Sequence, residues 1–269
     1  MGRYTISRAS RFLNISNESL RNYERRGLVS PERESNGYRY FTQRDLDKLQ
    51  GIHRFRNMGF SMNEIEELML TADSARVTEL LSGAAARLRE EQLWAAELER
   101  AAFRVADDWR HIGERLGRCE LTESPEILRV SMRYNADLTA PEITDEAAEW
   151  ARRMPVVFIS PRFPLEGILS GSSDVGFGYG VETFAFAQLG LKHIAAERFF
   201  PSAVSVMTVI ESVGGDHISC RSLRHVVDFC AGHGLTPAGD AWGVTLGNCV
   251  ENGVVHRYHR VYVPVKSAE

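Results

Sequence analysis

The clearest alternation of apolar and polar positions runs through residues 77–116, where apolar residues recur at spacings of four and three. This pattern predicts one long helix over about 74–118 with a continuous apolar seam. The seam contains Val77, Leu81, Ala84, Leu88, Ala95, Leu98, Ala102, Val105, Trp109, Ile112 and Leu116, and Glu91 is its polar exception.

The other faces of this helix are heavily charged, so the seam needs a separate surface to cover it. We predict a homodimeric coiled coil, because a seam of this length on one helix is typical of a paired helix. The alternative is a helix that packs on its own domain. The predicted interface residues are Leu81, Leu88, Leu98, Val105, Trp109, Ile112 and Leu116.

Short helices separated by turns are predicted for the first 70 residues or so. Thr5 stands at the start of one apolar periodicity, and Ser16 is placed to cap a second helix that ends at Gly27. Two short helices joined by a tight turn are typical of a helix-turn-helix. The second helix carries a basic and polar face, which suits base edges and phosphates of a DNA major groove.

A hairpin is predicted next, because the pair Asn36-Gly37 lies between two extended runs. Tyr38 and Tyr40 share one face of the returning strand and Arg39 takes the other, so this hairpin could form a wing beside the helix-turn-helix. In the alternative interpretation, the tyrosines only pack the hairpin.

Two further helices have clear start signals. Thr42 with Asp45 and Ser61 with Glu64 match the spacing of a capping box. Gly59 separates the two helices. This region therefore extends the helical N-terminal domain up to the long helix.

Residues 125–266 alternate between segments with strand-like patterns and segments with helix-like patterns, which predicts a mixed α+β domain. Gly176, Gly178 and Gly180 form a G-x-G-x-G series. A nucleotide-binding glycine loop is followed by a helix, whereas a strand-like segment follows here, so we interpret the series as a flexible hairpin edge. The predicted strands are 127–134, 156–160, 177–186, 203–211, 240–246 and 254–265, and the predicted helices are 141–154 and 216–232.

The chain has a net charge of −4, and its charged residues are distributed unevenly along the sequence. Residues 1–60 hold 12 Lys and Arg against 6 Asp and Glu, whereas the remainder holds 20 against 30. A basic start on an acidic body predicts an anionic partner at the N-terminus.

No apolar run approaches the roughly 18 residues of a membrane span, and no signal-peptide core is present. We therefore expect a cytoplasmic protein with no membrane partner. None of the cysteines forms a C-x-x-C pair, so we predict reduced thiols and neither a zinc module nor a redox motif. These cysteines are Cys119, Cys220, Cys230 and Cys249.

Residues 4–69 resemble the MerR family of winged-helix transcription regulators. The resemblance is carried in order by YTISRAS, LRNYERRGL, SPERESNGYRYF, DLDKL and FRNMGFSMNEIEELM. It implies a winged helix-turn-helix at 1–72 and a dimerisation helix at 73–120 that forms an antiparallel coiled coil. It also implies double-stranded promoter DNA and RNA polymerase as partners. Asn22 departs from the family, which often has an aromatic residue there.

The predicted DNA contacts come from the helices and the hairpin of this N-terminal region. Asn17, Ser19 and Arg21 are the candidates for base edges, with Tyr23 on a phosphate. The other candidates, which would position the DNA backbone, are Thr5, Tyr38, Arg39, Tyr40, His53, Arg54 and Arg56.

Residues 121–269 resemble the GyrI-like effector-binding domain of multidrug-sensing relatives, on SLRHVVDFCAGHGLTPAGDAW and the terminal HRVYVPV. The resemblance implies bulky aromatic, often cationic ligands, and in some relatives a buried glutamate. Here the equivalent residue, after Trp242, is Gly243. Either another carboxylate meets the ligand, with Glu182, Glu197 and Glu211 as candidates, or the ligand is not cationic. The predicted ligand contacts are Phe177, Tyr179, Glu182, Phe186, Glu211, Trp242 and Tyr258.

The combined prediction is an α+β, ligand-responsive, dimeric transcription regulator without cofactor or metal. By the resemblance it is an activator that distorts an overlong promoter spacer when a lipophilic aromatic compound, cationic or not, binds the C-terminal domain. The alternative is a GyrI-like small-molecule hydrolase, with Glu182 beside Tyr179, or a ligand-sequestering protein, with an attached DNA-binding module. We predict no catalytic residue.

Overall fold

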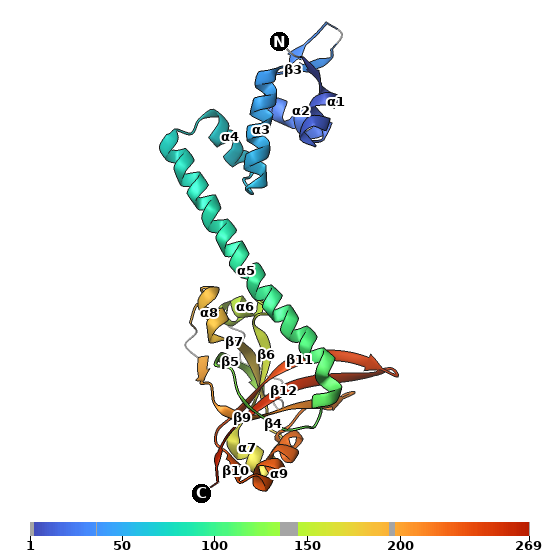
Figure 1. Cartoon of the computed structure of the whole chain (residues 1–269), viewed down its shortest axis with the longest axis vertical. Helices are drawn as coiled ribbons and strands as arrows, with labels where there is room; N and C mark the ends of the chain where they lie inside the picture. Colours follow the sequence, from blue (N-terminus) through green and yellow to red (C-terminus); the bar gives the residue numbers. More distant parts are fainter. Residues whose placement is uncertain (1–2, 36, 135–144, 194–196, 269) are drawn as a thin grey trace. The chain divides into compact units, whose positions relative to one another are not determined.

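The computed structural model describes residues 3–35, 37–134, 145–193 and 197–268, and the chain divides into two compact units. Unit 1 is Met1–Gln92 and unit 2 is Leu93–Glu269. Helix α5 (Ser74–Arg115) is one continuous helix, and the division falls inside it (Figure 1). The predicted domain boundaries near 72 and 120 stay predictions.

Unit 1 begins with a short strand, two helices and a hairpin, and two further helices follow before α5. Its elements are β1 (Tyr4–Thr5), α1 (Ile6–Leu13), α2 (Asn17–Arg25), β2 (Glu32–Arg33), β3 (Arg39–Phe41), α3 (Gln43–Asn57) and α4 (Met62–Leu70).

The predicted helix starts of unit 1 are confirmed, with one qualification. Ser16 Oγ accepts a hydrogen bond from the Ser19 backbone N–H at 3.0 Å, and α3 and α4 both begin with the predicted capping boxes. Thr5 precedes α1, but its side chain makes no capping hydrogen bond. Gly27 and Gly59 follow α2 and α3 with φ of 73° and 83°, which glycine adopts without steric cost.

The hairpin is confirmed as an antiparallel pair, β2 with β3, and β1 adds to the other side of β3. Asn36 of the predicted turn lies outside the described residues. Phe41, at the end of β3, is buried in a core with Ala9, Leu20 and Leu49, so the hairpin is anchored to the helices.

Unit 2 is built on an antiparallel sheet with helices beside it (Figure 1). In the described part of the chain this sheet has nine strands. Eight of them follow the order β4-β9-β12-β11-β6-β7-β5-β8, and the ninth, β10, lies off this path and pairs with β12. The strands are β4 (Glu120–Glu123), β5 (Ile127–Tyr134), β6 (Phe158–Phe163), β7 (Gly176–Glu182), β8 (Glu197–Phe200), β9 (Val204–Val213), β10 (Leu235–Pro237), β11 (Ala241–Glu251) and β12 (Val254–Ser267). The helices are α6 (Asp145–Ala151), α7 (Leu165–Ser170), α8 (Thr183–Gln188), the 3₁₀ turn η1 (Cys220–Leu223) and α9 (Arg224–Gly232).

The two faces of the sheet pack against different helices. Val206 and Ile210 of β9 join a core with Val226 of α9, whereas Val209 joins Ile112 of α5. Residues alternate between the faces of a strand, so one strand serves both cores. The C-terminal part of α5 therefore packs on the sheet opposite α9.

Several predicted elements of this unit were wrong in extent or place. The strand predicted over 177–186 ends at Glu182, where α8 begins, and the helix predicted over 216–232 starts only with the turn at Cys220. The start of the helix predicted over 141–154 lies outside the described residues. Strand β7 is paired on both sides, with β5 and β6, so the edge interpretation of its glycines was also wrong. A Cβ on Gly178 would lie 1.9 Å from the Val130 carbonyl oxygen, so this glycine permits close strand pairing.

The predicted seam of α5 has two environments. Leu81 and Leu88 are 36% and 45% exposed, whereas Ile112 is buried on the sheet of its own unit. Trp109 also faces this sheet and donates from Nε1 to the Leu246 carbonyl oxygen at 3.1 Å. Packing on the same domain thus accounts for this part of the seam, and the coiled coil stays a prediction.

Candidate functional site

Two arginines of the hairpin meet one carboxylate of α2. Glu24 pairs with Arg33 and Arg39, in each case at 2.6 Å. Burial by itself raises the pKa of Glu24, but hydrogen bonds from both guanidinium groups outweigh it, so that its pKa is lowered. Arg21 and Arg25 line the same depression. The cluster is therefore rich in positive charge, which can attract an anion.

The predicted base-contacting residues lie at the start of α2. Asn17 and Arg21 are exposed, and Ser19 is half-buried with its hydroxyl 2.9 Å from that of Ser16. Tyr23 is only 7% exposed and contributes to the core of unit 1. Asn17 and Arg21 thus have side chains available for a duplex, while the Tyr23 ring is mostly covered.

The remaining predicted DNA contacts are spread over β1, the hairpin and α3. Tyr38 is 65% exposed, and Tyr40 is half-buried opposite Thr5, with the Arg3 guanidinium carbon 5.9 Å from its ring centre. On α3, Arg54 and Arg56 are exposed and His53 is half-buried.

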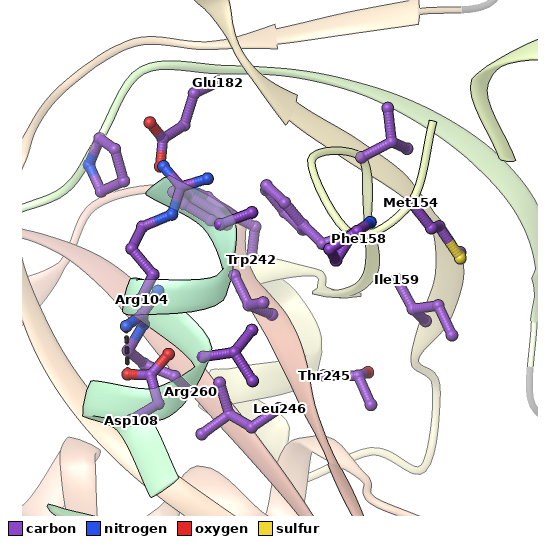
Figure 2. Close-up of a pocket in the computed structure, with 16 residues that line it drawn as sticks. Arg104, Asp108, Met154, Phe158, Ile159, Glu182, Trp242, Thr245, Leu246 and Arg260 are labelled. Atoms are coloured by element: carbon purple, nitrogen blue, oxygen red, sulfur yellow. Dashed lines mark hydrogen bonds and ion pairs between the residues drawn. The ribbon is translucent and has the colours of Figure 1, made fainter. Parts of the chain in front are cut away.

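Unit 2 contains a cavity of about 280 Å³, bounded by α5 and by strands β6, β7, β11 and β12 (Figure 2). Its size is near the lower end of ligand pockets, which span about 300–1,000 Å³. The interior is mainly apolar, and Met154, Ile159 and Val105 of its lining are each more than a third exposed. The cavity can therefore admit a compact apolar molecule past apolar side chains.

Aromatic rings form one wall of the cavity. Trp242 is 1% exposed, and its ring centre lies 6.3 Å from that of Phe158, in a stacked pair, and 4.9 Å from that of Tyr262, in a tilted pair. A Cβ on Gly180 would lie 2.6 Å from the Phe158 ring, so glycine at this position makes room for the stack. Such a wall suits a flat aromatic ligand.

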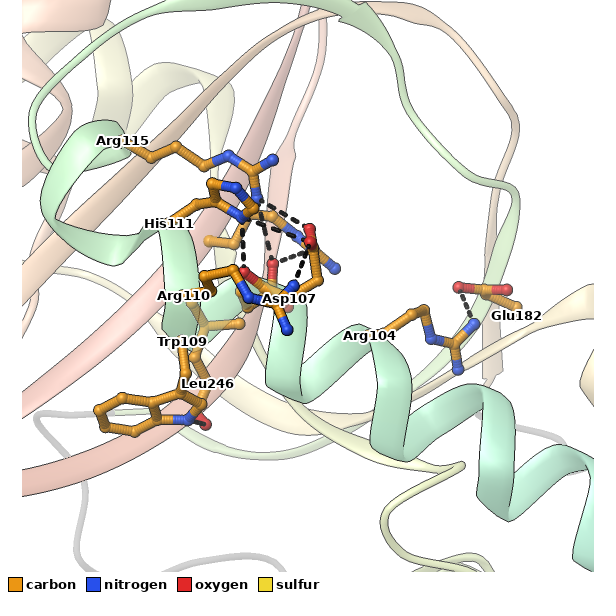
Figure 3. A network of polar contacts seen from close by, with 10 residues as sticks. Arg104, Asp107, Trp109, Arg110, His111, Arg115, Glu182 and Leu246 are labelled. Atoms are coloured by element: carbon orange, nitrogen blue, oxygen red, sulfur yellow. Dashed lines mark hydrogen bonds and ion pairs between the residues drawn. The ribbon is translucent and has the colours of Figure 1, made fainter.

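Two ion pairs join α5 to the sheet at this cavity (Figure 2), and Figure 3 shows the one between Arg104 and Glu182. Arg104 donates to Glu182 at 2.7 Å, and Arg260 donates from Nη1 to the buried carboxylate of Asp108. Arg115 lies 3.7 Å from the same carboxylate. Burial raises the pKa of Asp108, and the two neighbouring arginines only partly oppose this shift.

Of the predicted ligand contacts, the structure brings Glu182 and Trp242 together at the cavity. The others are elsewhere in unit 2. Phe177 packs against the α9 core, and Tyr179 and Phe186 join a core with Trp150. Tyr258 lies against Trp109 with ring centres 5.9 Å apart, and Glu211 bonds His256 at 2.6 Å. The side chain of Glu197 lies outside the described residues.

Sequence reasoning missed Arg104, Asp108 and Arg260. The first two lie on the helix whose apolar seam was assigned to a dimer, and their polar character resembled that of a solvated face. Position 243 also has a structural reason to lack an acid. A Cβ on Gly243 would lie 2.7 Å from the Arg260 carbonyl oxygen and 3.1 Å from Pro161 Cγ, so a larger side chain requires movement.

Among the described residues, no group of three or more His, Cys, Asp or Glu side chains could hold a metal ion, and the four cysteines are free. No helix in the described ranges is long and apolar enough to cross a membrane.

Comparison with known proteins identifies the N-terminal region. Residues 4–71 match the model of the MerR HTH family of regulatory proteins. A mercuric resistance operon regulatory protein of Bacillus cereus is 31% identical over 96 residues, which are 35% of this chain and 73% of that protein. The chain belongs to the MerR family of helix-turn-helix regulatory proteins.

Coverage differs among the relatives. The chain spans 56% of the length of a probable heavy metal-dependent transcriptional regulator of Haemophilus influenzae, at 36% identity over 26% of this chain. The transcriptional activator TipA of Streptomyces coelicolor is 26% identical over 82% of this chain and 98% of its own. A cryo-EM structure of an EcmrR–DNA complex in EcmrR-RPo aligns over 98% of this chain and 100% of that one, with 16% identity and a TM-score of 0.35.

Proposed function

We propose that this regulator binds promoter DNA as a homodimer through unit 1 and responds to a small aromatic effector in the cavity of unit 2. The observation that carries this proposal is the composition of the cavity wall. Ala101, Arg104, Val105 and Asp108 of α5 line the cavity, and α5 begins in unit 1. An effector would therefore touch the helix that is continuous with the DNA-binding unit.

The DNA-binding part of the proposal rests on α2 and the hairpin. Asn17 and Arg21 would read base edges, and the hairpin would act as a wing whose Arg39 holds a phosphate. Glu24 would orient Arg33 and Arg39 before DNA arrives, since it pairs with both. The two arginines share one carboxylate, so positive charge remains for the phosphate backbone.

The coiled coil would supply the two-fold symmetry. The exposed Leu81 and Leu88 support a helix partner for the N-terminal part of α5. The resemblance of unit 2 to GyrI-like effector domains and the match to the activator TipA support activation, with RNA polymerase at the same promoter. Deforming a promoter spacer costs on the order of 1–10 kcal/mol. An effector can drive this change only if it binds the deforming conformation more tightly.

Binding to duplex DNA tests this function. When the whole chain is used to select duplexes from a random-sequence pool, the selected duplexes should contain binding sites with two-fold symmetry. Arg21→Ala should weaken binding by about 1–3 kcal/mol, because it removes a base contact, and Arg39→Ala should lower the salt dependence of binding by about one phosphate contact. Fluorescence anisotropy at several salt concentrations measures both.

The matched control is Arg224→Ala, which removes an exposed arginine of α9 in unit 2. Its affinity should equal that of the wild type. If Arg21→Ala and Arg224→Ala weakened binding equally, the loss would reflect general charge, and the assignment of α2 to base contacts would be wrong.

A further inference from the structure

We propose that the cavity of unit 2 selects uncharged aromatic molecules over aromatic cations, because each of its carboxylates is already held by an arginine of the cavity wall. This inference concerns the effector class and rests on the effector cavity of the proposed function. Arg104, Asp108, Glu182 and Arg260 are the charged residues of its lining, so positive and negative charges are equal in number.

The charges are also paired in space. Arg104 and Glu182 are 2.7 Å apart, and Asp108 accepts from Arg260. In Figure 2 the Arg104 guanidinium points toward Glu182, and Asp108 and Arg260 meet below it. The wall thus presents two compact dipoles to a guest and offers it no separate carboxylate.

A cationic guest would have to compete for one of these carboxylates. To reach Glu182, whose side chain is 29% exposed, it must either approach the Arg104 guanidinium, which lies 2.7 Å from that carboxylate and repels a cation, or displace it. To reach Asp108, it must compete with Arg260 and Arg115, and this carboxylate is 4% exposed. A cation also loses its own hydration in the cavity, and no separate carboxylate of the wall offsets that cost.

An uncharged ring meets no such penalty. It can lie against Trp242 and Phe158 and keep both ion pairs intact, since the remaining lining is mostly aliphatic. The Trp242 ring can attract a cation, but this contact does not replace the hydration that a charge loses in the cavity. Arg104 and Arg260 are therefore expected to decide the preference.

Two probes of nearly equal size and shape test the preference. Quinaldine is uncharged in mildly alkaline buffer, and N-methylquinolinium is a permanent cation. Isothermal titration calorimetry with the whole chain should give at least about tenfold tighter binding of quinaldine, which is a difference of about 1.4 kcal/mol. Equal or tighter binding of the cation, or binding of neither probe, would overturn the inference.

Variants of the ion pair should reverse the preference. Arg104→Gln releases Glu182, so N-methylquinolinium affinity should rise about tenfold while quinaldine affinity stays within about twofold. Glu182→Gln releases Arg104 and should raise the affinity for naphthoate relative to naphthamide. The control is Arg100→Gln, which removes an arginine one turn earlier that stacks on Phe184 and does not line the cavity.

If Arg104→Gln and Arg100→Gln bound both quinolines alike, the charge-pair argument would be refuted. This outcome differs from failure of the proposed function. Loss of all duplex binding by the wild-type chain would refute DNA binding and would leave the order of the two quinolines unaffected.

Discussion

Glu24 in unit 1 and Asp108 in unit 2 are each shared by two arginines, yet their environments differ. Glu24 is 15% exposed and its hairpin partner Arg33 is 59% exposed, whereas Asp108 is 4% exposed and Arg260 17%. The pKa of Glu24 is lowered and that of Asp108 is raised. The same pairing of a carboxylate with two arginines therefore goes with opposite pKa shifts. At Asp108, burial penalises the charged carboxylate more strongly than the neighbouring arginines favour it.

The difference also corresponds to two uses of arginine. In unit 1 the pairs lie at the surface, where water can replace any partner and an anionic duplex can join. In unit 2 the Asp108–Arg260 pair joins a helix to the sheet at 4% and 17% exposure, where a lost partner is not replaced, whereas Glu182 and Arg104 are 29% and 34% exposed. We therefore expect a single change of charge at the Asp108–Arg260 pair to have the larger effect.

The largest expected effect is that of Arg260→Met. It leaves Asp108 buried with only Arg115 nearby, and breaking such a pair costs about 4 kcal/mol at neutral pH. Trp94, Trp109, Trp150 and Trp242 all lie in unit 2, so tryptophan fluorescence during urea unfolding reports this unit.

The double variant Arg260→Met with Asp108→Leu should recover most of that loss, because it removes both charges. Arg224→Met, which breaks an exposed ion pair with Asp228, should change stability by less than about 0.5 kcal/mol. A double variant no more stable than Arg260→Met would show that packing, and not charge, dominates at this site.

A second prediction concerns His259, which is 1% exposed and lies 3.1 Å from the Thr245 hydroxyl through Nδ1. Burial, aided by Arg257, lowers the pKa of His259 from its ordinary 6.5 to about 4. The unfolded chain therefore binds the proton first, so stability is full above about pH 6.5 and is lost as the pH falls toward 4. The loss should reach about 3 kcal/mol in the same fluorescence assay.

His259→Gln should flatten this part of the pH profile, whereas His217→Gln, at an exposed position, should keep the wild-type profile. A wild-type profile that is level between pH 6.5 and 4 would contradict the assigned burial of His259.

The smallest effect is expected for Arg39→Met in unit 1. Arg33 still holds Glu24 after this change and water reaches the cluster, so the loss should be about 1 kcal/mol or less. Since the tryptophans lie in unit 2, hydrogen exchange of α3 backbone amides measures it, with Arg44→Met as the control on the same unit. A loss as large as that of Arg260→Met would remove the contrast between the two clusters.

Prediction from sequence succeeded where the signals are local. The Ser16 cap, the two capping boxes and the hairpin depend on residues a few positions apart, and the structure has them as predicted. It failed at β7, where pairing with β5 and β6 places the strand inside the sheet, and at the end of that strand, where α8 begins. Strand order depends on contacts between distant residues, which a local pattern does not contain.

By itself, the sequence determined the class of this protein and the starts of its N-terminal helices, because capping, turn formation and the family motif act over short stretches of chain. Only the tertiary structure decided which charges meet at the cavity. Arg104 lies 78 residues from Glu182 and Asp108 lies 152 residues from Arg260, so their pairing follows from how α5 packs on the sheet. Burial at that contact, and not residue type, sets their chemistry.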